Sequence, residues 1–311
     1  MVGVVWRAFT SGWLTPPWGY NIDLEYKPIT SVEELGSKKE TYTEYYSRSF
    51  KGQETRKLYI MRHGERADNA FGDWTSHCFD KNGNYFQTDL NMPETVPKRS
   101  GGYNTYLKDS PLTKIGIFLA QLTSEAFKKE QINVSHVYCS PSLRCIQTCH
   151  AFLEGCGKND IKIKVEPGLY EWWAFFGDSL PESLTPEELT TWGYNIDLEY
   201  QPIISIDALG GKKETYAEYC SRSLVVSTEA MNAHSHGNVL FVAHGCTVAA
   251  CSWELTGKKT ELTQETVDVA VGVPYCGFIE VSQCGDKWKK GRPFLHLSHT
   301  SNAVFDYSRL F

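Results

Sequence analysis

The apolar run Leu58-Tyr-Ile-Met61 ends abruptly in the polar segment Arg62-His63-Gly64-Glu65-Arg66. A short apolar run predicts a buried β-strand, and the glycine after it allows the backbone to turn. The histidine stands between arginines, whose planar guanidinium groups donate paired hydrogen bonds to phosphate. A neutral imidazole is also a good nucleophile near pH 7. The segment therefore predicts a strand that carries an anion-binding, nucleophilic turn at its end.

Strand-like and helix-like segments alternate from about residue 56 onward. Strands are predicted at Lys57–Met61, His136–Cys139, Ile161–Val165 and Asn238–Ala243, with an edge hairpin made of Gly277–Ser282 and Arg292–Ser298. Helices are predicted from the N-cap Thr113 to Lys129, from the capping pair Ser140-Pro141 to Leu153, and from Thr247 to Leu255, where Gly257 stops the helix. This alternation predicts an α/β fold, a three-layer sandwich whose mostly parallel central sheet has helices on both faces.

Residues 67–110 show no sustained periodicity and contain several glycines and prolines, so they predict a long loop. A loop of that length inside a compact domain is usually functional. His63-Gly64 and His244-Gly245 both fall at the carboxyl ends of predicted strands, where α/β sheets bind their ligands.

An internal repeat marks the domain organisation. The segment Trp18–Phe50 is nearly repeated by Trp192–Leu224, at a constant offset and without a gap. Within the second copy, Ser205 is expected to cap a turn and Glu214–Leu224 to form an amphipathic helix. A domain has one place for such an element, so we favour residues 1–55 as an N-terminal appendage carrying a partial duplicate, followed by a domain over 56–311. A functional arm that docks on the domain or swaps between subunits is the alternative.

The composition narrows the partners and cofactors. The 311 residues carry 31 basic and 37 acidic side chains, a net charge of −6, which argues against a general nucleic-acid binder. The ten cysteines form no CxxC pair, so free thiols in a reducing cytoplasm are expected, with Cys139, Cys145, Cys149 and Cys156 in the core or on helix faces. His234 and His236 are expected on a solvated loop rather than at a metal. Neither a membrane span nor a signal peptide is expected from the sequence, and a homodimer is left open.

Four pieces of the chain are expected to converge on one site. The first is Arg62, His63 and Arg66. The second is Arg144, on the first turn of a helix whose N-terminus favours an anion. The third is Glu171, next to Trp172, Trp173 and Phe175, and the fourth is His244.

In this order, these pieces resemble the histidine phosphatase, or phosphoglycerate-mutase-like, superfamily over about residues 56–311. The resemblance is strongest to the branch of the ecdysteroid-phosphate phosphatases and of the phosphatase domain of the TULA proteins. It rests on Arg62-His-Gly-Glu-Arg-Ala-Asp68, Cys78-Phe-Asp80, Asp89-Leu-Asn-Met-Pro93, Asp109-Ser-Pro-Leu-Thr113 and Val273-Pro-Tyr-Cys276. The ubiquitin-binding and adaptor domains of the TULA proteins have no room in this chain, which favours the steroid-phosphate enzyme.

The resemblance implies a role for each residue. His63 would be the nucleophile that forms a phosphohistidine, with its second ring nitrogen bonded to a backbone carbonyl. The phosphoryl oxygens would be surrounded by Arg62, Arg66, Arg144 and His244. Glu171 would protonate the leaving oxygen and then activate water, and hydrophobic neighbours and the nearby phosphate charge would raise its pKa. Glu65 is expected to orient an arginine. No metal or other cofactor is expected, because the arginines supply the positive charge.

The aromatic cluster beside Glu171 motivates the choice of substrate. An apolar leaving group needs apolar walls, so Trp172, Trp173 and Phe175 are expected to form a leaving-group pocket for bulky phosphomonoesters. Steroid phosphate is the first candidate and a phosphotyrosine peptide the second. For the aromatic residues, the alternative is a role in the core. For the protein, the alternatives are a mutase and a phospho-ligand binding module without turnover.

Overall fold

A single sheet lies at the centre of the part of the chain that the computed structural model describes, which is residues 56–177, 179–210, 213–258, 260–284, 287–291, 296–297 and 305–311. Its strand order is β3-β2-β4-β1-β5-β6. The strands are β1 (Lys57–Arg62), β2 (Val134–Cys139), β3 (Ile163–Val165), β4 (Asn238–Ala243), β5 (Phe278–Cys284) and β6 (Lys287–Lys290). The predicted appendage at 1–55, with the first copy of the repeat, lies outside the described residues.

The four strands β3, β2, β4 and β1 run parallel, whereas β5 and β6 complete the sheet as an antiparallel pair. Neighbouring strands β1 and β4 are in register, with Arg62 opposite Ala243. The histidine that follows each of these residues therefore leaves the sheet at the same edge. This pairing puts the two His-Gly motifs side by side, although they are far apart in the sequence.

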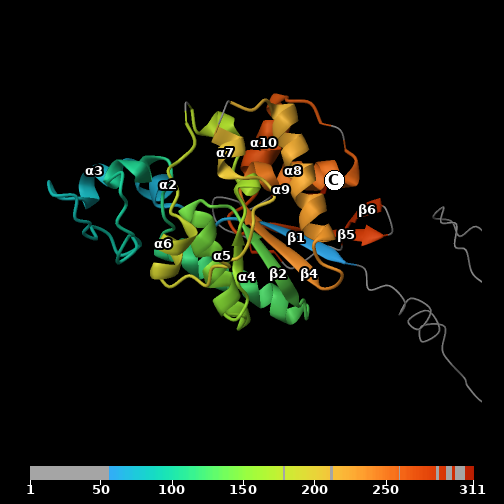
Figure 1. The fold of residues 1–311 in the computed structure, drawn as a ribbon, viewed down its shortest axis with the longest axis horizontal. Coiled ribbons are helices and arrows are strands. Elements are labelled where there is room, and N and C mark those ends of the chain that lie inside the picture. The colour runs from blue at the N-terminus through green and yellow to red at the C-terminus, as the bar shows by residue number, and fades with distance from the viewer. Residues whose placement is uncertain are drawn as a thin grey trace, which may run out of the picture. The chain divides into compact units, whose positions relative to one another are not determined.

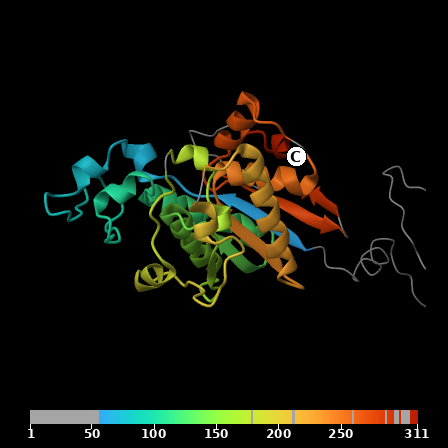
Figure 2. The ribbon, with the colours of Figure 1, turned by 45° about the horizontal axis from the view of Figure 1, so that its top comes forward.

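Helices cover both faces of the sheet, as Figures 1 and 2 show. On one face lie α4 (Lys114–Lys129) and α5 (Leu143–Cys156), and on the other lie α8 (Tyr216–Asn232) and α9 (Gly245–Thr256). Alternate residues of β1 feed two separate cores: Tyr59 and Met61 pack toward α4 and α5, whereas Leu58 and Ile60 pack toward α8 and α9. Side chains of a strand alternate between its faces, so this division follows from the pleat. The predicted three-layer α/β sandwich is confirmed.

The remaining helices are short and lie in the connections. They are α2 (Ala67–Phe71), α3 (Thr75–Cys78), α6 (Pro186–Thr191), α7 (Ile206–Gly210) and α10 (Gln264–Gly272), with 3₁₀ turns η1 (Tyr103–Leu107), η2 (Pro167–Leu169), η3 (Trp173–Phe175) and η5 (Tyr307–Leu310). The predicted loop over 67–110 is thus interrupted by α2, α3 and η1. Among the described helices, none has the length and apolar character needed to cross a membrane.

Capping explains where the longer helices begin. The Thr113 hydroxyl accepts a hydrogen bond from Gly116 N, as predicted, and begins α4. Helix α8 begins with a capping box in which Thr215 and Glu218 satisfy each other's backbone amides. The expected cap of α5 at Ser140-Pro141 was wrong: the N-cap is Ser142, and its side chain makes no capping bond. Ser140 instead turns toward His244.

The edge hairpin was placed correctly for β5 but wrongly for its partner. The partner strand is Lys287–Lys290, not Arg292–Ser298. Within that predicted range the structure describes only residues 296–297, and these lie outside any strand. Three of the four residues in Lys287–Lys290 are lysines, so the alternation of apolar and polar residues that predicts a strand is hard to recognise there. Lysines are common on strands at an exposed sheet edge.

The second copy of the repeat is built into this fold. Ile196 bridges Ile163 at the edge of the sheet, so the first part of the copy lies beside β3. The buried carboxylate of Glu166 then accepts hydrogen bonds from the Tyr200 hydroxyl and from the Ile203 and Ile204 amides. The Ser205 hydroxyl accepts from Ala208 N, as expected for a capped turn. The copy ends within α8, whose N-terminal turns face the candidate site.

Candidate active site

The centre of the site is the pair of imidazoles that follow β1 and β4. The rings of His63 and His244 lie 5.5 Å apart between centroids, in an edge-to-face arrangement. His63 Nδ1 lies 2.8 Å from the Gly64 carbonyl oxygen, which is the backbone bond expected for this histidine. A carbonyl can only accept, so Nδ1 carries the proton and Nε2 keeps its lone pair.

Glycine is required after His63 because two backbones meet there. A Cβ atom on Gly64 would lie 2.6 Å from the carbonyl oxygen of Gly116, in the first turn of α4. The Gly64 amide donates to the Thr148 hydroxyl (2.9 Å), and that hydroxyl donates to the Arg144 carbonyl (2.7 Å). The turn that carries His63 is therefore attached to both α4 and α5.

Arg144 reaches the site from the first turn of α5 and is almost completely buried, with a relative exposure of 2%. Its Nη2 donates to His244 Nδ1 at 3.2 Å, and the His244 Nε2 lies 2.9 Å from the Ser140 hydroxyl oxygen. Because a guanidinium only donates, Nδ1 of His244 is the acceptor and Nε2 carries the proton. Both ring nitrogens of His244 are therefore engaged.

Arg144 is held by the buried carboxylate of Asp109. Asp109 Oδ1 lies 3.5 Å from Arg144 Nη1 and accepts from Leu143 N at 2.8 Å. Its Oδ2 pairs with Arg99 Nη2 at 2.6 Å. A carboxylate shared by two guanidinium groups and a helix amide fixes Arg144 while leaving the site with an excess of positive charge.

Arg62 and Arg66 lie on either side of His63 in the sequence and are held differently. Arg62 Nη1 donates to the Val271 (3.0 Å) and Val273 carbonyl oxygens, and its guanidinium lies 4.7 Å from the centroid of the Tyr275 ring. Arg66 directs Nε and Nη2 to the carboxylate of Asp68. Only the Nη1 side of Arg66 is left for another anion in this arrangement.

Several guanidinium atoms at this site are buried without a hydrogen-bond partner among the described residues. They are Arg62 Nε, Arg144 Nε and Arg144 Nη1. Burying an N–H group without a partner is costly, and structures rarely tolerate it except where another molecule supplies the acceptor. Arg144 Nη1 still faces Asp109 Oδ1 at ion-pair distance (3.5 Å), so Arg62 Nε and Arg144 Nε are the donors here that no described residue satisfies. Two such donors in the field of the same imidazole suit a small oxyanion.

Burial and positive charge keep both histidines neutral. Burial lowers the pKa of His63 well below its ordinary value, and the charges of Arg144, Arg62, His244 and Arg66 lower it further. The pKa of His244 is also lowered well below its ordinary value, first by burial and then by Arg144 and Arg66. A neutral His63 keeps the Nε2 lone pair that nucleophilic attack requires.

Glu171 lies in the turn between η2 and η3, within the field of the same arginines. Its Oε1 accepts from Trp172 N at 3.0 Å and from the Tyr219 hydroxyl at 3.3 Å. Burial raises the pKa of Glu171, while the Trp172 amide and the charges of Arg144 and Arg62 oppose the increase. The carboxyl is thus moved toward the range in which a group can both give and accept a proton near neutral pH.

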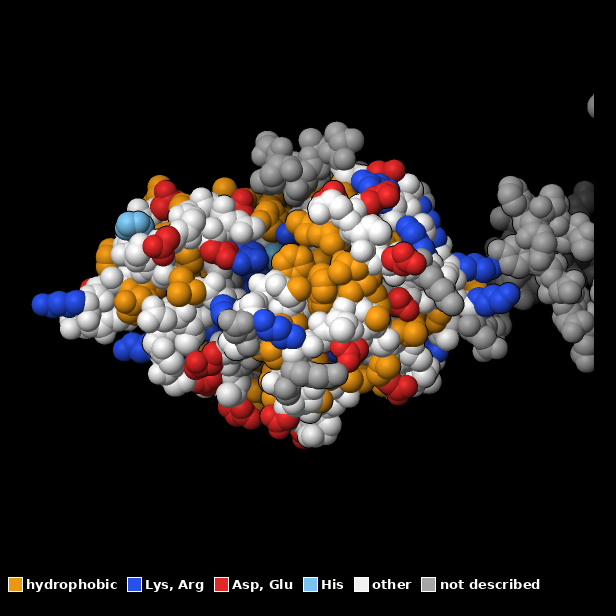
Figure 3. Space-filling view, turned by 90° about the horizontal axis from the view of Figure 1, so that it is seen from above, with side chains coloured by type: hydrophobic (Ala, Val, Ile, Leu, Met, Phe, Trp, Pro, Cys, Tyr) orange, Lys and Arg blue, Asp and Glu red, His pale blue; other side chains and the backbone are white. Residues whose placement is uncertain are grey.

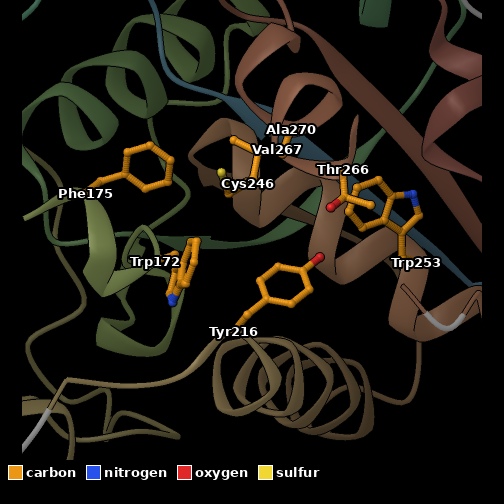
Figure 4. Close-up of a pocket in the computed structure, with 8 residues that line it drawn as sticks. All are labelled: Trp172, Phe175, Tyr216, Cys246, Trp253, Thr266, Val267 and Ala270. Atoms are coloured by element: carbon orange, nitrogen blue, oxygen red, sulfur yellow. The ribbon is translucent and has the colours of Figure 1, made fainter. Parts of the chain in front are cut away.

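An apolar pocket adjoins Glu171, and Figure 4 shows the side chains that converge on it. They come from the Glu171 turn and from α8, α9 and α10: Trp172, Phe175, Tyr216, Cys246, Trp253, Thr266, Val267 and Ala270. The space-filling view in Figure 3 shows hydrophobic side chains gathered near the middle of one face, with Lys and Arg side chains on one side of them and Asp and Glu side chains on the other.

The three predicted pocket residues do not share one role. Trp172 and Phe175 line the pocket, and Phe175 is 51% exposed. Trp173 does not line this pocket, because its side chain is buried and donates to the Gly177 carbonyl. In a 3₁₀ turn the side chains at i and i+3 lie on the same side, so Trp172 and Phe175 share a face that Trp173 does not.

Two other sequence-based expectations were tested by the structure. Glu65 does not orient an arginine: its Oε1 accepts from the Thr113 hydroxyl (2.7 Å) and from Asn91 Nδ2 (3.2 Å), which links β1 to the start of α4. His234 and His236 do lie on the loop before β4, but His234 is half-buried and stacks on His136 with ring centroids 3.5 Å apart. Among the described residues, no group of three or more His, Cys, Asp or Glu side chains is arranged to hold a metal ion.

Sequence reasoning missed several residues that shape the site. Asp109 was noticed only as part of a family segment, and Tyr219 only as part of an amphipathic helix. Ser140 was noticed only as a helix cap and Tyr275 only within the family segment Val273–Cys276, whereas nothing in the local sequence marks Cys246. Their contacts are with His244, Arg62 and Glu171, respectively.

Comparisons with known proteins show the family of the chain. Residues 98–289 match the family model of the histidine phosphatase superfamily (branch 1), a range that includes Arg144, Glu171 and His244 and begins after His63. The chain is 42% identical over 260 residues to the ecdysteroid-phosphate phosphatase of Drosophila melanogaster, covering 82% of this chain and 34% of that protein. It is 40% identical over 264 residues to the human ubiquitin-associated and SH3 domain-containing protein B, covering 82% of this chain and 40% of that protein.

A solved structure is similar over its whole length. The crystal structure of the ecdysone phosphate phosphatase from Bombyx mori in complex with tungstate superposes with a TM-score of 0.69 and 34% identity, covering 82% of this chain and all of that one. The chain spans about a third of the length of the curated fly relative and 40% of the human one. Chain length therefore does not separate the two kinds of relative, contrary to the expectation that it favours the steroid-phosphate enzyme.

Proposed function

Because this chain belongs to the histidine phosphatase superfamily, we propose that it hydrolyses phosphomonoesters through a phosphohistidine formed on His63. The observation that carries the proposal is the set of buried, unpaired N–H groups of Arg62 and Arg144 beside a neutral imidazole. A phosphoryl group would supply the acceptors that these donors lack. The silkworm relative, crystallised with tungstate, binds an oxyanion of similar shape, which supports a similar ligand here.

The first step transfers the phosphoryl group to the enzyme. The Nε2 lone pair of His63 attacks phosphorus, the bond from phosphorus to the leaving oxygen breaks, and Glu171 gives its proton to that oxygen. Arg62, Arg144 and the free side of Arg66 neutralise charge on the remaining oxygens, which is where phosphoryl transfer gains most of its rate. The Gly64 carbonyl holds the Nδ1 proton and stabilises the positive charge that develops on the ring.

The second step returns the enzyme to its starting state. The Glu171 carboxylate takes a proton from water, the water oxygen attacks phosphorus, and the bond from phosphorus to His63 Nε2 breaks. Inorganic phosphate leaves, and Glu171 is protonated again. Division into two transfers replaces one difficult displacement with two easier ones. His244 would act by holding Arg144, and its Nε2 must release the Ser140 hydroxyl before it can donate to a phosphoryl oxygen.

We further propose that the leaving group is bulky and apolar, with steroid phosphate as the first candidate. The pocket of Trp172, Phe175, Tyr216 and Trp253 adjoins Glu171, where the leaving oxygen must receive its proton. The names of the fly and silkworm relatives point to the same class. The enclosed part of the pocket is narrow, so a fused ring system would rest on Phe175 and Trp172 at its open side.

A substrate panel tests this proposal. We expect kcat/KM for ecdysone phosphate to exceed that for glycerol phosphate by at least about tenfold, because the pocket contributes binding only to the larger group. A phosphotyrosine peptide forms the third arm, and a higher value there would replace the steroid by a protein substrate. Equal values on all three would exclude selection by the pocket, and no turnover together with His63-dependent phosphate binding would indicate a binding module.

Phe175 offers a matched pair of variants for the same panel. Phe175→Ala should lower kcat/KM on the bulky ester about tenfold and leave glycerol phosphate unchanged, because only the larger leaving group contacts this ring. Phe118→Ala on α4 is the control, since Phe118 is similarly exposed (59%) and does not line the pocket. A similar loss in both variants would show that the effect comes from stability rather than from substrate contact.

A further inference from the structure

The turn that carries Glu171 is held from outside by residues of the second repeat copy. Arg222, on α8, donates from Nη1 to the carbonyl oxygens of Gly168 (2.7 Å) and Tyr170 (3.1 Å), which precede Glu171. The turn belongs to no strand, so its backbone has no hydrogen bonds to a sheet. The two bonds from Arg222 hold the backbone instead. Arg222 is itself buried, with 8% exposure, and cannot be a solvated surface charge.

The other side of the turn is attached to Glu214, just before α8. Glu214 Oε1 accepts from Trp173 N and its backbone carbonyl accepts from Trp172 Nε1, both at 3.4 Å. The same carboxylate pairs with Arg222, through Nε at 3.0 Å and through Nη2. Arg222 and Glu214 therefore form one ion pair that grips the backbone on both sides of Glu171.

Between these two residues, Tyr219 reaches the Glu171 carboxyl itself. Its hydroxyl oxygen lies 3.3 Å from Glu171 Oε1 and 3.0 Å from the Thr247 hydroxyl on α9. The ring is completely buried, and the Arg222 guanidinium lies 4.8 Å from its centroid. Packing and a cation–π contact thus fix the direction of the phenol.

A phenol with these two neighbours can serve both protonation states of Glu171. It has a single proton, which it can donate to Glu171 when the carboxyl is ionised and to Thr247 when the carboxyl is protonated. Its lone pairs accept from the Thr247 hydroxyl in the first case. The Trp172 amide and the Tyr219 hydroxyl both donate to Oε1, and the Cys246 thiol is a further, weaker partner of the same carboxyl. Oε2 is therefore the oxygen that the two stronger donors leave to carry the transferable proton.

We propose that Tyr219 is the positioning residue of the acid–base step, holding Oε1 of Glu171 so that Oε2 faces the leaving oxygen and then the attacking water. The inference rests on the proposed function and adds the group that orients its proton donor. Burial raises the pKa of Tyr219 well above its ordinary value, so the phenol stays protonated and remains a donor across the working range.

The test compares kcat/KM for two substrates that differ in their leaving group. A merely structural role of Tyr219 would not change the ratio of these two values. para-Nitrophenolate leaves without protonation, whereas the alkoxide of benzyl phosphate must receive a proton as the bond breaks. We expect Tyr219→Phe to lower kcat/KM about tenfold or more on benzyl phosphate and less than about twofold on para-nitrophenyl phosphate. The basic limb of the benzyl phosphate pH profile should move to higher pH, because the carboxylate loses a donated hydrogen bond.

Tyr200→Phe is the matched control. Tyr200 also lies in the second repeat copy and also donates its hydroxyl to a buried carboxylate, at Glu166 Oε2 (2.6 Å). Removing that hydroxyl is the same chemical change at a position that does not reach Glu171. We expect Tyr200→Phe to lower the midpoint of thermal unfolding but to leave the ratio of the two kcat/KM values unchanged.

The outcomes separate this inference from the proposed function. If wild type turns over, His63→Ala does not, and Tyr219→Phe lowers both substrates equally, the positioning role is wrong while the function stands. If wild type hydrolyses neither ester, both fall together. Should Tyr219→Phe not fold, Thr247→Val removes the second partner of the phenol and is expected to act in the same direction. An unchanged substrate ratio in a folded Thr247→Val protein would likewise overturn the role of the network.

Discussion

The two His-Gly pairs occupy equivalent positions at the ends of neighbouring parallel strands, yet their imidazoles are bonded differently. His63 has one ring nitrogen on the Gly64 carbonyl, and no residue in the described part of the chain hydrogen-bonds to Nε2. His244 has both nitrogens engaged, by Arg144 and by Ser140. The same dipeptide therefore provides an open lone pair at one strand and a fixed partner of an arginine at the other.

The position of each strand in the sheet explains the difference. Strand β4 lies between β1 and β2, and the connection after β2 brings Ser140 and Arg144 to His244. Strand β1 has β5 on its other side, and the turn before β5 brings the Tyr275 ring, 6.0 Å from the His63 ring between centroids. The Nε2 lone pair of His63 is therefore left without a donor among the described residues, whereas the Nδ1 lone pair of His244 accepts from Arg144.

The largest effect is expected at the open imidazole. His63→Ala should lower kcat by about 10⁴-fold or more, because the residue that forms the covalent intermediate has no substitute. The measurement is steady-state hydrolysis of para-nitrophenyl phosphate, with thermal unfolding to show that the variant is folded. Alkaline quenching should trap a phosphoenzyme in wild type and none in the variant. Residual activity near the wild-type value would break the distinction between the two histidines.

Substitution of the engaged imidazole should cost less. His244→Asn is expected to lower kcat by about 10²–10³-fold, the usual loss when one group that stabilises the transition-state charge is removed. The phosphoenzyme should still form on His63, only more slowly, as rapid-quench labelling would show. If His244→Asn abolished labelling and His63→Ala retained it, the roles assigned to the two histidines would be reversed.

The two glycines should respond alike, because each meets a carbonyl oxygen of another segment. An added Cβ would lie 2.6 Å from Gly116 O at Gly64 and 2.4 Å from Ala270 O at Gly245. Each alanine substitution should lower the free energy of unfolding by about 1–3 kcal/mol in urea titrations, the usual cost of overpacking. Gly210→Ala is the control, since a Cβ there meets no atom within 4 Å. A neutral effect at either site would mean that its backbone can shift.

The smallest effect concerns pH and tests the property that His63 and His244 share, which is a lowered pKa. The pKa of both histidines is lowered in the folded chain, so between the ordinary value of about 6.5 and the lower folded value the unfolded chain binds more protons. Stability should therefore fall as pH drops below about 6.5, by up to about 1.4 kcal/mol per pH unit for each histidine. His63→Asn should show a shallower fall between pH 7.5 and 5.5 in urea titrations. An unchanged slope would mean that His63 is protonated in the fold.

Much of the fold followed from local pattern. The apolar runs of β1 and β4, the Thr113 cap and the glycine after α9 predicted strands and helices at their observed places, because these signals act over a few neighbouring residues. The errors fell where local signal is weak or ambiguous. Strand β6 is an exposed run of lysines, and the Ser140 hydroxyl bonds His244 instead of capping a helix.

The sequence by itself determined which residues carry charge, nucleophilicity and proton exchange, because those are properties of side chains at the ends of recognisable strands. Tertiary structure decided how they are used. Only the packing of β1 between β4 and β5 left His63 Nε2 open, and only the approach of α8 put the Tyr219 hydroxyl on Glu171, across 48 positions of sequence. Contacts between segments so far apart are fixed by the collective packing of layers, which no stretch of neighbouring residues encodes.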